Sequence, residues 1–176
     1  MLLLGCDPGK SGGIALLATG PKPRLIACIS VPIAPPGSDD LLDVDAIIAF
    51  IQNEPPDEAF IERVAPMPSD EGNGKKRRAM GATSAFNFGG AVYTLRTCIV
   101  GLGIKLTRVE PTAWKKAHGL SSKDSATGLK LDQRHVKELS RQKAIALFGD
   151  EFFPNIGHHN RAEAALIANY GAMLRR

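Results

Sequence analysis

Short apolar runs, separated by turn residues, predict three strands at the start of the chain. The runs cover residues 2–6, 14–17 and 24–33. Glycines and prolines follow the first and third runs, and these residue types end strands and form turns. Beyond the last of these breaks, Asp39 or Asp40 is placed to cap a helix that extends to about residue 52.

The remainder of the chain is predicted to alternate strands and helices. The predicted strands cover residues 58–64 and 105–109. The predicted helices cover residues 82–100, a short segment from Pro111, residues 133–148 and residues 160–174. Residues 65–78 are rich in Pro, Gly, Ser, Asp, Lys and Arg, so they are predicted to form an exposed basic loop. This order of elements favours an α/β fold in which helices flank a mixed five-stranded sheet.

Two adjacent glycines, Gly89 and Gly90, lie inside the helix predicted at residues 82–100. Each costs about 1 kcal/mol relative to alanine in a helix interior. They indicate that the backbone packs closely against a neighbour, and a second copy of the same helix is a candidate. We therefore expect self-association through this helix.

The composition is typical of one globular domain that covers residues 1–176. Hydrophobic residues make up 44% of the chain and charged residues 23%. No segment approaches the roughly 20 consecutive apolar residues of a membrane span. The cysteines, Cys6, Cys28 and Cys98, are odd in number and lie apart in apolar segments, which favours reduced thiols over disulfides or a zinc site. These features predict a cytoplasmic protein.

Basic residues concentrate in two parts of the chain. The excess of 22 Lys and Arg over 18 Asp and Glu gives a net charge of only +4, but one cluster lies in the loop at 65–78 and another extends from Lys115 to Lys143. Such clusters favour a polyanionic partner, although the residues after Lys116 are also consistent with a solvated helix face. The candidate DNA contacts are Lys75, Lys76, Arg77, Arg78, Lys115, Lys116, Lys123, Arg134, Lys137 and Arg141.

Three carboxylates stand next to apolar runs that would form the core. Asp7 follows the first run, Glu62 lies in the fourth predicted strand, and Glu163 lies near the start of the last predicted helix. An ionised carboxylate in the core is costly unless a cation compensates it, so a divalent-metal site explains the three together. Taken singly, Asp7 could form a turn, Glu62 could point outward, and Glu163 could stabilise a helix N-terminus.

Five segments of the chain match motifs of one known family. They are Gly5-Cys6-Asp7-Pro8-Gly9, Phe60-Ile61-Glu62-Arg63-Val64, Ser84-Ala85-Phe86-Asn87-Phe88-Gly89, Pro111-Thr112-Ala113-Trp114-Lys115-Lys116 and Arg161-Ala162-Glu163-Ala164. In this order they resemble the Holliday junction resolvases of the RuvC family, including phage-encoded members, which have the ribonuclease H-like fold. The resemblance spans nearly the whole chain. It implies an endonuclease that acts on four-way or other branched DNA in the cytoplasm of a bacterial cell.

The resemblance also implies a site for two divalent ions, Mg²⁺ or Mn²⁺, and no organic cofactor. Asp7 would bridge the two ions, Glu62 would hold one, and Glu163 would complete the other. Two such ions activate a water and stabilise the leaving oxygen in phosphodiester hydrolysis. Because a four-way junction is two-fold symmetric, paired nicks imply a homodimer. Trp114, in the fourth motif, is expected to pack in the core rather than stack on bases.

The chain departs from the family pattern at the fourth metal-ligand position. The family places an Asp or His three or four residues before the final acid, where this chain has Asn160 and His159. Asn160 offers a carbonyl oxygen without charge and would bind a metal more weakly than aspartate, while His159 could serve as a ligand or as a general base. Two interpretations therefore stay open, an active nuclease and a junction-binding protein with an impaired metal site.

A phosphotransferase is a further alternative, and it depends on the first turn. Asp7-Pro8-Gly9, followed by Gly12-Gly13, also resembles the phosphate loop of actin-like phosphotransferases. That class needs two such domains around a cleft, and 176 residues are too few for both. We therefore favour the nuclease interpretation.

Overall fold

A sheet of five strands lies at the centre of the computed structural model, which describes residues 1–64, 81–123 and 127–175. The strands are ordered β3-β2-β1-β4-β5 across the sheet. Their bounds are β1 (Leu2–Asp7), β2 (Gly13–Ala18), β3 (Arg24–Ser30), β4 (Glu58–Glu62) and β5 (Lys105–Val109). The predicted mixed five-stranded sheet is confirmed.

The strand directions bring two acids to one edge of the sheet. β1 is antiparallel to β2, and β2 to β3, whereas β1, β4 and β5 run parallel to one another. Parallel neighbours have their carboxyl ends at the same edge, and Cys6 of β1 pairs with Ile61 of β4. Asp7 and Glu62, which end these two strands, therefore occupy adjacent positions.

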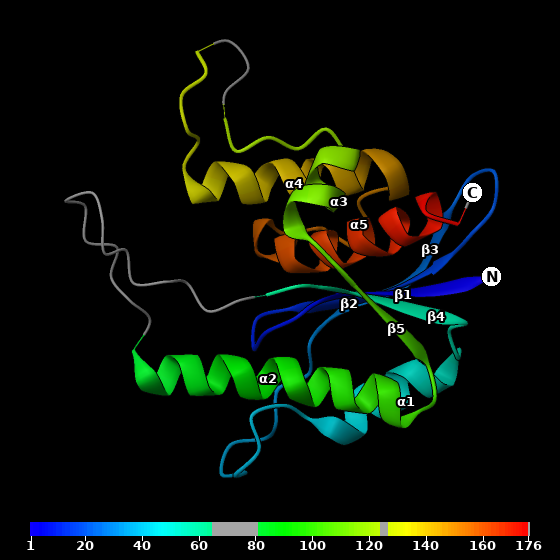
Figure 1. Ribbon diagram of the computed structural model, residues 1–176, viewed down its shortest axis with the longest axis vertical. Helices are drawn as coiled ribbons and strands as arrows, with labels where there is room; N and C mark the ends of the chain where they lie inside the picture. The colour runs from blue at the N-terminus through cyan, green and yellow to red at the C-terminus, as the bar shows by residue number, and fades with distance from the viewer. Residues whose placement is uncertain (65–80, 124–126, 176) are drawn as a thin grey trace.

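Helices cover both faces of the sheet (Figure 1). α1 and α2 lie on one face, and α3, α4 and α5 lie on the other, with the short helix η1 leading into α5. Their bounds are α1 (Val44–Asn53), α2 (Ala82–Gly101), α3 (Pro111–Ala117), α4 (Gln133–Phe148), η1 (Ile156–His158) and α5 (His159–Met173). Among the described residues, no helix is both long and apolar enough to span a bilayer.

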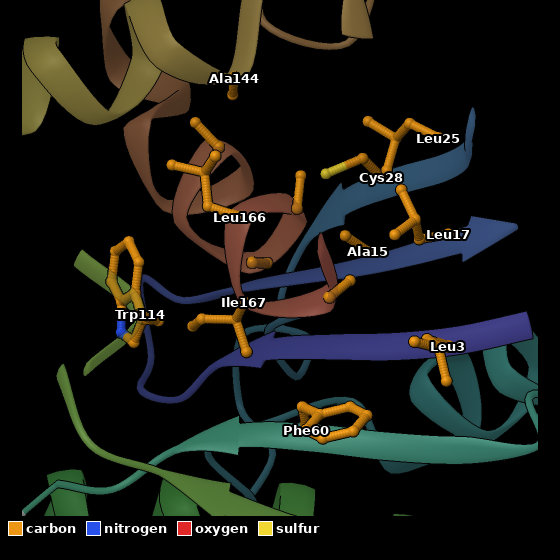
Figure 2. Packing of buried hydrophobic residues seen from close by; sticks show 14 of the residues in the cluster. Leu3, Ala15, Leu17, Leu25, Cys28, Phe60, Trp114, Ala144, Leu166 and Ile167 are labelled. Carbon is orange, nitrogen blue, oxygen red and sulfur yellow. The ribbon is translucent and has the colours of Figure 1, made fainter. Parts of the chain in front are cut away.

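Alternation along the strands gives the sheet an apolar layer on each face. Leu3 and Leu17 belong to the layer that includes α5 and Trp114 (Figure 2). Leu4 and Ile14 belong to the layer that includes α1 and α2. Both faces of the central strands are therefore buried, as their continuous apolar runs indicate.

α5 packs on β1 with almost no space between their backbones. A Cβ built at Gly5 would lie 2.1 Å from the carbonyl oxygen of Ala164 and 2.5 Å from the amide nitrogen of Ala168. A residue without a side chain is therefore required where α5 crosses β1. This contact sets the height of α5 above the sheet.

The start of the first helix was predicted wrongly. Asp43, rather than Asp39 or Asp40, caps α1, and its side chain accepts a hydrogen bond of 2.9 Å from the backbone of the first turn. An antiparallel bridge between Ile33 and Leu42 holds the preceding chain, so the helix begins later than the aspartates alone suggest.

Candidate active site

Two neighbouring strands and one helix supply three carboxylates to the same region. Asp7 ends β1 and Glu62 ends β4, and these strands pair in parallel. Glu163 lies early in α5, directly before Ala164, which packs against Gly5 of β1. The close crossing of α5 over β1 therefore brings Glu163 toward the two strand ends.

Burial and nearby charges shift the pKa of Asp7 and of Glu62. The pKa of Asp7 is raised well above its usual value, first by burial and then by the negative charges of Glu163 and Glu62, while Lys115 and Lys137 oppose the shift. The pKa of Glu62 is also raised, first by burial and further by Glu163, against the opposing charge of Lys115. Burial beside like charges destabilises the ionised acids, so this region favours an added cation.

Glu62 and Glu163 are each held by a neighbouring side chain. The indole Nε1–H of Trp114 donates to Oε2 of Glu62 at 2.9 Å, and the hydroxyl of Ser140 donates to Oε1 of Glu163 at 3.0 Å. Nζ of Lys115 lies 4.0 Å from the same Glu163 oxygen. Lys115 therefore offsets part of the negative charge of the cluster.

In the ranges that the structure describes, no three His, Cys, Asp or Glu side chains are grouped closely enough to hold a metal ion. Glu62 and Glu163 are each hydrogen-bonded through one oxygen to the protein donors just named. Their chemistry nevertheless fits a hard divalent cation, because every donor is a carboxylate oxygen. Burial, and then the charges of Glu163 and Glu62, raise the pKa of Asp7, and a bound cation would favour its ionised form.

Solved structures with this architecture include Holliday junction resolvases. RuvC from T. thermophilus in complex with a Holliday junction substrate matches with a TM-score of 0.66 and 16% sequence identity, over 99% of this chain and 96% of that chain. The fowlpox virus Holliday junction resolvase matches with a TM-score of 0.59 and 10% identity, over 100% of both chains. This chain has the resolvase fold. No family model and no curated protein sequence gives a significant match.

Asn160 and His159, predicted for the fourth ligand position of the resolvase site, are bonded to backbone carbonyls. Nδ2 of Asn160 donates to the carbonyl oxygen of Ser11, in the turn between β1 and β2. Nδ1 of His159 lies 3.3 Å from the carbonyl oxygen of Ile156. A Cβ at Gly13 would lie 2.4 Å from the backbone oxygen of Asn160, so this residue also packs against the turn. Asn160 thus links α5 to the β1–β2 connection.

The predicted basic residues fall into groups with different surroundings. Lys115 and Lys137 lie close enough to Asp7 to lower its pKa. Three others are exposed, namely Lys116, Lys123 and Arg134. The four basic residues predicted in the loop lie outside the described residues, namely Lys75, Lys76, Arg77 and Arg78.

Arg141 has an intramolecular role that its place in a basic stretch did not indicate. Its Nε donates to the carbonyl oxygen of Phe153 at 3.0 Å, and its Nη1 pairs with Glu138 at 2.9 Å. Only 15% of its side chain is exposed. These contacts tie α4 to the segment that precedes α5, so Arg141 is a structural residue.

Sequence reasoning missed the donors that hold the acids, Trp114 and Ser140. Trp114 is buried, as predicted, but its hydrogen bond to Glu62 was not foreseen. A signal was present, because α3 follows β5, and β5 pairs with β4, so α3 begins beside the end of β4. Ser140 carried no such signal, because its contact with Glu163 depends on how α4 packs on α5.

Proposed function

We propose that this chain is a structure-selective endodeoxyribonuclease that resolves Holliday junctions by paired nicks. The observation that carries the proposal is the convergence of Asp7 and Glu62, at the carboxyl ends of two parallel strands, with Glu163 of α5 in a resolvase fold. Two proteins with this fold, RuvC from T. thermophilus and the fowlpox virus resolvase, were solved with junction DNA. A function on branched DNA accounts for the acidic site and its basic neighbours together.

Metal-dependent hydrolysis is the reaction that these acids fit best. Asp7 would be shared between two divalent ions, with Glu62 on one and Glu163 on the other. Mg²⁺ and Mn²⁺ both prefer oxygen ligands, and when bound they activate a water and stabilise the leaving 3′ oxygen. The chain's own donors orient the acids, because Trp114 holds Glu62 and Ser140 holds Glu163.

Basic residues near the acids would bind the DNA backbone. Lys115 and Lys137 lie at the site itself, where each would attract a phosphate to the carboxylate cluster. The exposed residues Lys116, Lys123 and Arg134 are further candidates for contacts with the DNA backbone. Such contacts read the position and shape of a junction rather than its sequence.

A homodimer would place two such sites on opposite strands of the junction. On α2, the side chains of Phe86, Tyr93 and Val100 are 82%, 65% and 58% exposed and are spaced seven residues apart, so they lie along one side of the helix. Among the residues that the structure describes, a Cβ built at Gly89 or Gly90 would meet nothing within 4 Å, which leaves room for a partner on this part of α2. We propose that α2 contacts a second copy of the chain, as a two-fold symmetric substrate requires.

One observation favours a second candidate, a junction-binding protein without cleavage activity. Nδ2 of Asn160 donates to Ser11, and the oxygen that its side chain could offer at the fourth ligand position carries no charge. A metal site with a neutral ligand in place of a charged one would bind its ions more weakly. In that case the chain would bind branched DNA through its basic surface alone.

The deciding experiment compares cleavage of a four-way junction, a flap and a linear duplex by the purified chain in Mg²⁺, Mn²⁺ and EDTA. We expect paired nicks in the junction that are lost in EDTA and in Asp7→Asn. Equal cutting of linear duplex would contradict the junction selectivity. Junction binding without cleavage in either metal, with cleavage appearing in Asn160→Asp, would instead establish the second candidate.

A further inference from the structure

Trp114 in α3 is completely buried and contacts one acidic and one basic side chain of the candidate site. Figure 2 shows its ring in the cluster beneath α4 and α5. Its Nε1–H donates to Oε2 of Glu62 at 2.9 Å, while Nζ of Lys115 lies 4.9 Å from the centre of the ring. A cation over an indole face is attracted by the ring's electrons. One rigid side chain therefore positions two groups of opposite charge, the Glu62 carboxylate and the Lys115 ammonium group.

The indole leaves one oxygen of Glu62 for other ligands. Its hydrogen bond is made to Oε2, and among the described residues no hydrogen bond to Oε1 is formed. A carboxylate that is fixed through one oxygen by a neutral donor keeps its charge and loses rotational freedom. Donors outside the metal shell orient metal-binding acids in this way. Trp114 has the position and the chemistry of such a donor.

A buried histidine–asparagine pair holds the helix of Trp114 against α5. His118 is 4% exposed, and its Nδ1 lies 2.7 Å from the carbonyl oxygen of Trp114 while its Nε2 lies 3.1 Å from Nδ2 of Asn169. Because a carbonyl only accepts, Nδ1–H is assigned as the donor, and the neutral Nε2 accepts from the Asn169 amide. Burial lowers the pKa of His118, which keeps the ring neutral. The pair therefore fixes α3 to the helix that carries Glu163.

We propose that Trp114 is a positioning residue that orients Glu62 for divalent-cation binding, and that the His118–Asn169 pair keeps α3 in place on α5. The inference rests on the proposed metal-dependent function. It goes further by assigning a residue that determines how tightly the acids hold an ion. The buried indole would act through Glu62 and would not touch metal or DNA.

Two variants remove the donor. Trp114→Phe keeps an aromatic ring in the core without the N–H group but leaves a cavity in place of the second ring. Trp114 is also the single tryptophan of the chain. Growth of a tryptophan auxotroph on benzothienylalanine therefore replaces the N–H by sulfur at this position alone, with almost no change in shape.

The measurements separate metal binding, catalysis and DNA binding. For both variants, we expect the Kd for Mn²⁺, measured by calorimetry without DNA, to rise on the order of tenfold, because loss of an outer donor typically costs that much in affinity. The kcat for junction cleavage should fall, whereas the Kd for junction DNA in EDTA should stay within about twofold, because the phosphate contacts are unchanged. In the unmodified protein, Mn²⁺ should quench the emission of Trp114 over the same concentration range.

Leu25→Ala is the matched control for lost packing. Leu25 belongs to the same buried cluster, but it lies on β3, which β2 and β1 separate from β4. This variant should be less stable than the unmodified chain and should bind Mn²⁺ with unchanged affinity. A rise in Kd as large as that of Trp114→Phe would reduce the effect of Trp114 to general destabilisation and would overturn the proposal.

The outcomes distinguish this inference from the function on which it rests. If the unmodified chain neither binds Mn²⁺ nor cleaves the junction, the metal-dependent function fails and the inference fails with it. If the unmodified chain binds Mn²⁺ and the benzothienylalanine protein binds it equally well, the function stands and the role of Trp114 is refuted. The benzothienylalanine protein decides the matter if Trp114→Phe does not fold.

Discussion

Arg175 donates two hydrogen bonds to Glu58, from Nε at 2.9 Å and from Nη2 at 2.6 Å. Glu58 begins β4, at the end of the strand opposite to Glu62, and it is 6% exposed. Its Oε1 also accepts from the hydroxyl of Thr107 at 3.1 Å and lies 3.1 Å from Nζ of Lys105. The pair ties the segment after α5 to the sheet.

Stability should fall in acid as Glu58 is protonated. The hydrogen bonds from Arg175 are the main reason that the pKa of Glu58 is lowered from 4.5 to about 2. Because the folded chain holds this carboxylate ionised more strongly than the unfolded chain does, its stabilising effect is complete above about pH 4.5 and is lost as the pH falls toward 2. We expect the thermal midpoint of Arg175→Met to change less with pH over this window than that of the unmodified chain.

Lys105→Met is the control. It removes a side chain that is 72% exposed and should change the dependence of the thermal midpoint on pH less than Arg175→Met does. Parallel acid profiles for Arg175→Met and the unmodified chain would show that the pair does not stabilise the fold.

Asp7→Asn should abolish junction cleavage and stabilise the protein in EDTA. A neutral amide is cheaper to bury than a carboxylate, and it is not repelled by Glu163 or Glu62. We expect a gain of roughly 1 kcal/mol in the free energy of unfolding, as for other substitutions that relieve functional strain. Urea denaturation in EDTA measures it, with Asp39→Asn, at an exposed position outside the helices and strands, as the neutral control. A less stable Asp7→Asn would argue against repulsion among the acids.

Tyr93→Glu should disrupt the proposed dimer without unfolding the chain. Tyr93 is 65% exposed, so a charge there costs little in a monomer but is costly when buried against a second α2. Sedimentation velocity should show a shift from dimer to monomer, and paired nicking should become single nicking. Leu129→Glu is the control, because Leu129 is 69% exposed and lies outside α2. Equal sedimentation of Tyr93→Glu and the unmodified chain would remove α2 as the interface.

Lys137→Ala and Arg141→Ala should have different effects, although both residues lie in α4. Lys137 is exposed near the acids, so its loss should weaken junction binding for all sequences. The slope of the logarithm of the binding constant against the logarithm of the salt concentration should become smaller in magnitude by about one. Arg141→Ala should instead lower the free energy of unfolding by roughly 1–3 kcal/mol, because Glu138 and the carbonyl of Phe153 lose their donor. Fluorescence anisotropy at several salt concentrations and urea denaturation measure the two effects. The assignment is wrong if Arg141→Ala changes the salt dependence and Lys137→Ala changes only stability.

The three acids could be singled out from sequence because each stands next to an apolar run, and the run before Asp7 fixes where β1 stops. The end of β4 was not predicted, because the expected strand extends to residue 64 whereas β4 ends at Glu62. The pairing of β1 with β4 makes Asp7 and Glu62 neighbours. The predicted order of elements was enough to give the α/β fold. These features depend on local pattern and strand order, which the sequence carries directly.

The orientation of polar side chains could not be predicted in the same way. The spacing of Asn160 from Glu163 predicts a ligand, but it does not show that Nδ2 of Asn160 donates to the Ser11 carbonyl, far away in sequence. Arg141 has the charge of a phosphate contact, but Glu138 and Phe153 engage it first. Both outcomes are decided by which groups the tertiary packing brings within hydrogen-bond distance.

α5 rests on the sheet at three positions where a side chain is missing. A Cβ at Gly5 would enter the backbone of α5, one at Gly13 would meet the backbone of Asn160, and one at Gly171 would lie 2.4 Å from the ring of Phe60. The distance between the acids on the strands and Glu163 on the helix therefore depends on these absent methyl groups. Adding one of them back would push the helix away from the sheet and move Glu163 away from Asp7 and Glu62, so the spacing of the three carboxylates could be altered without replacing any of them.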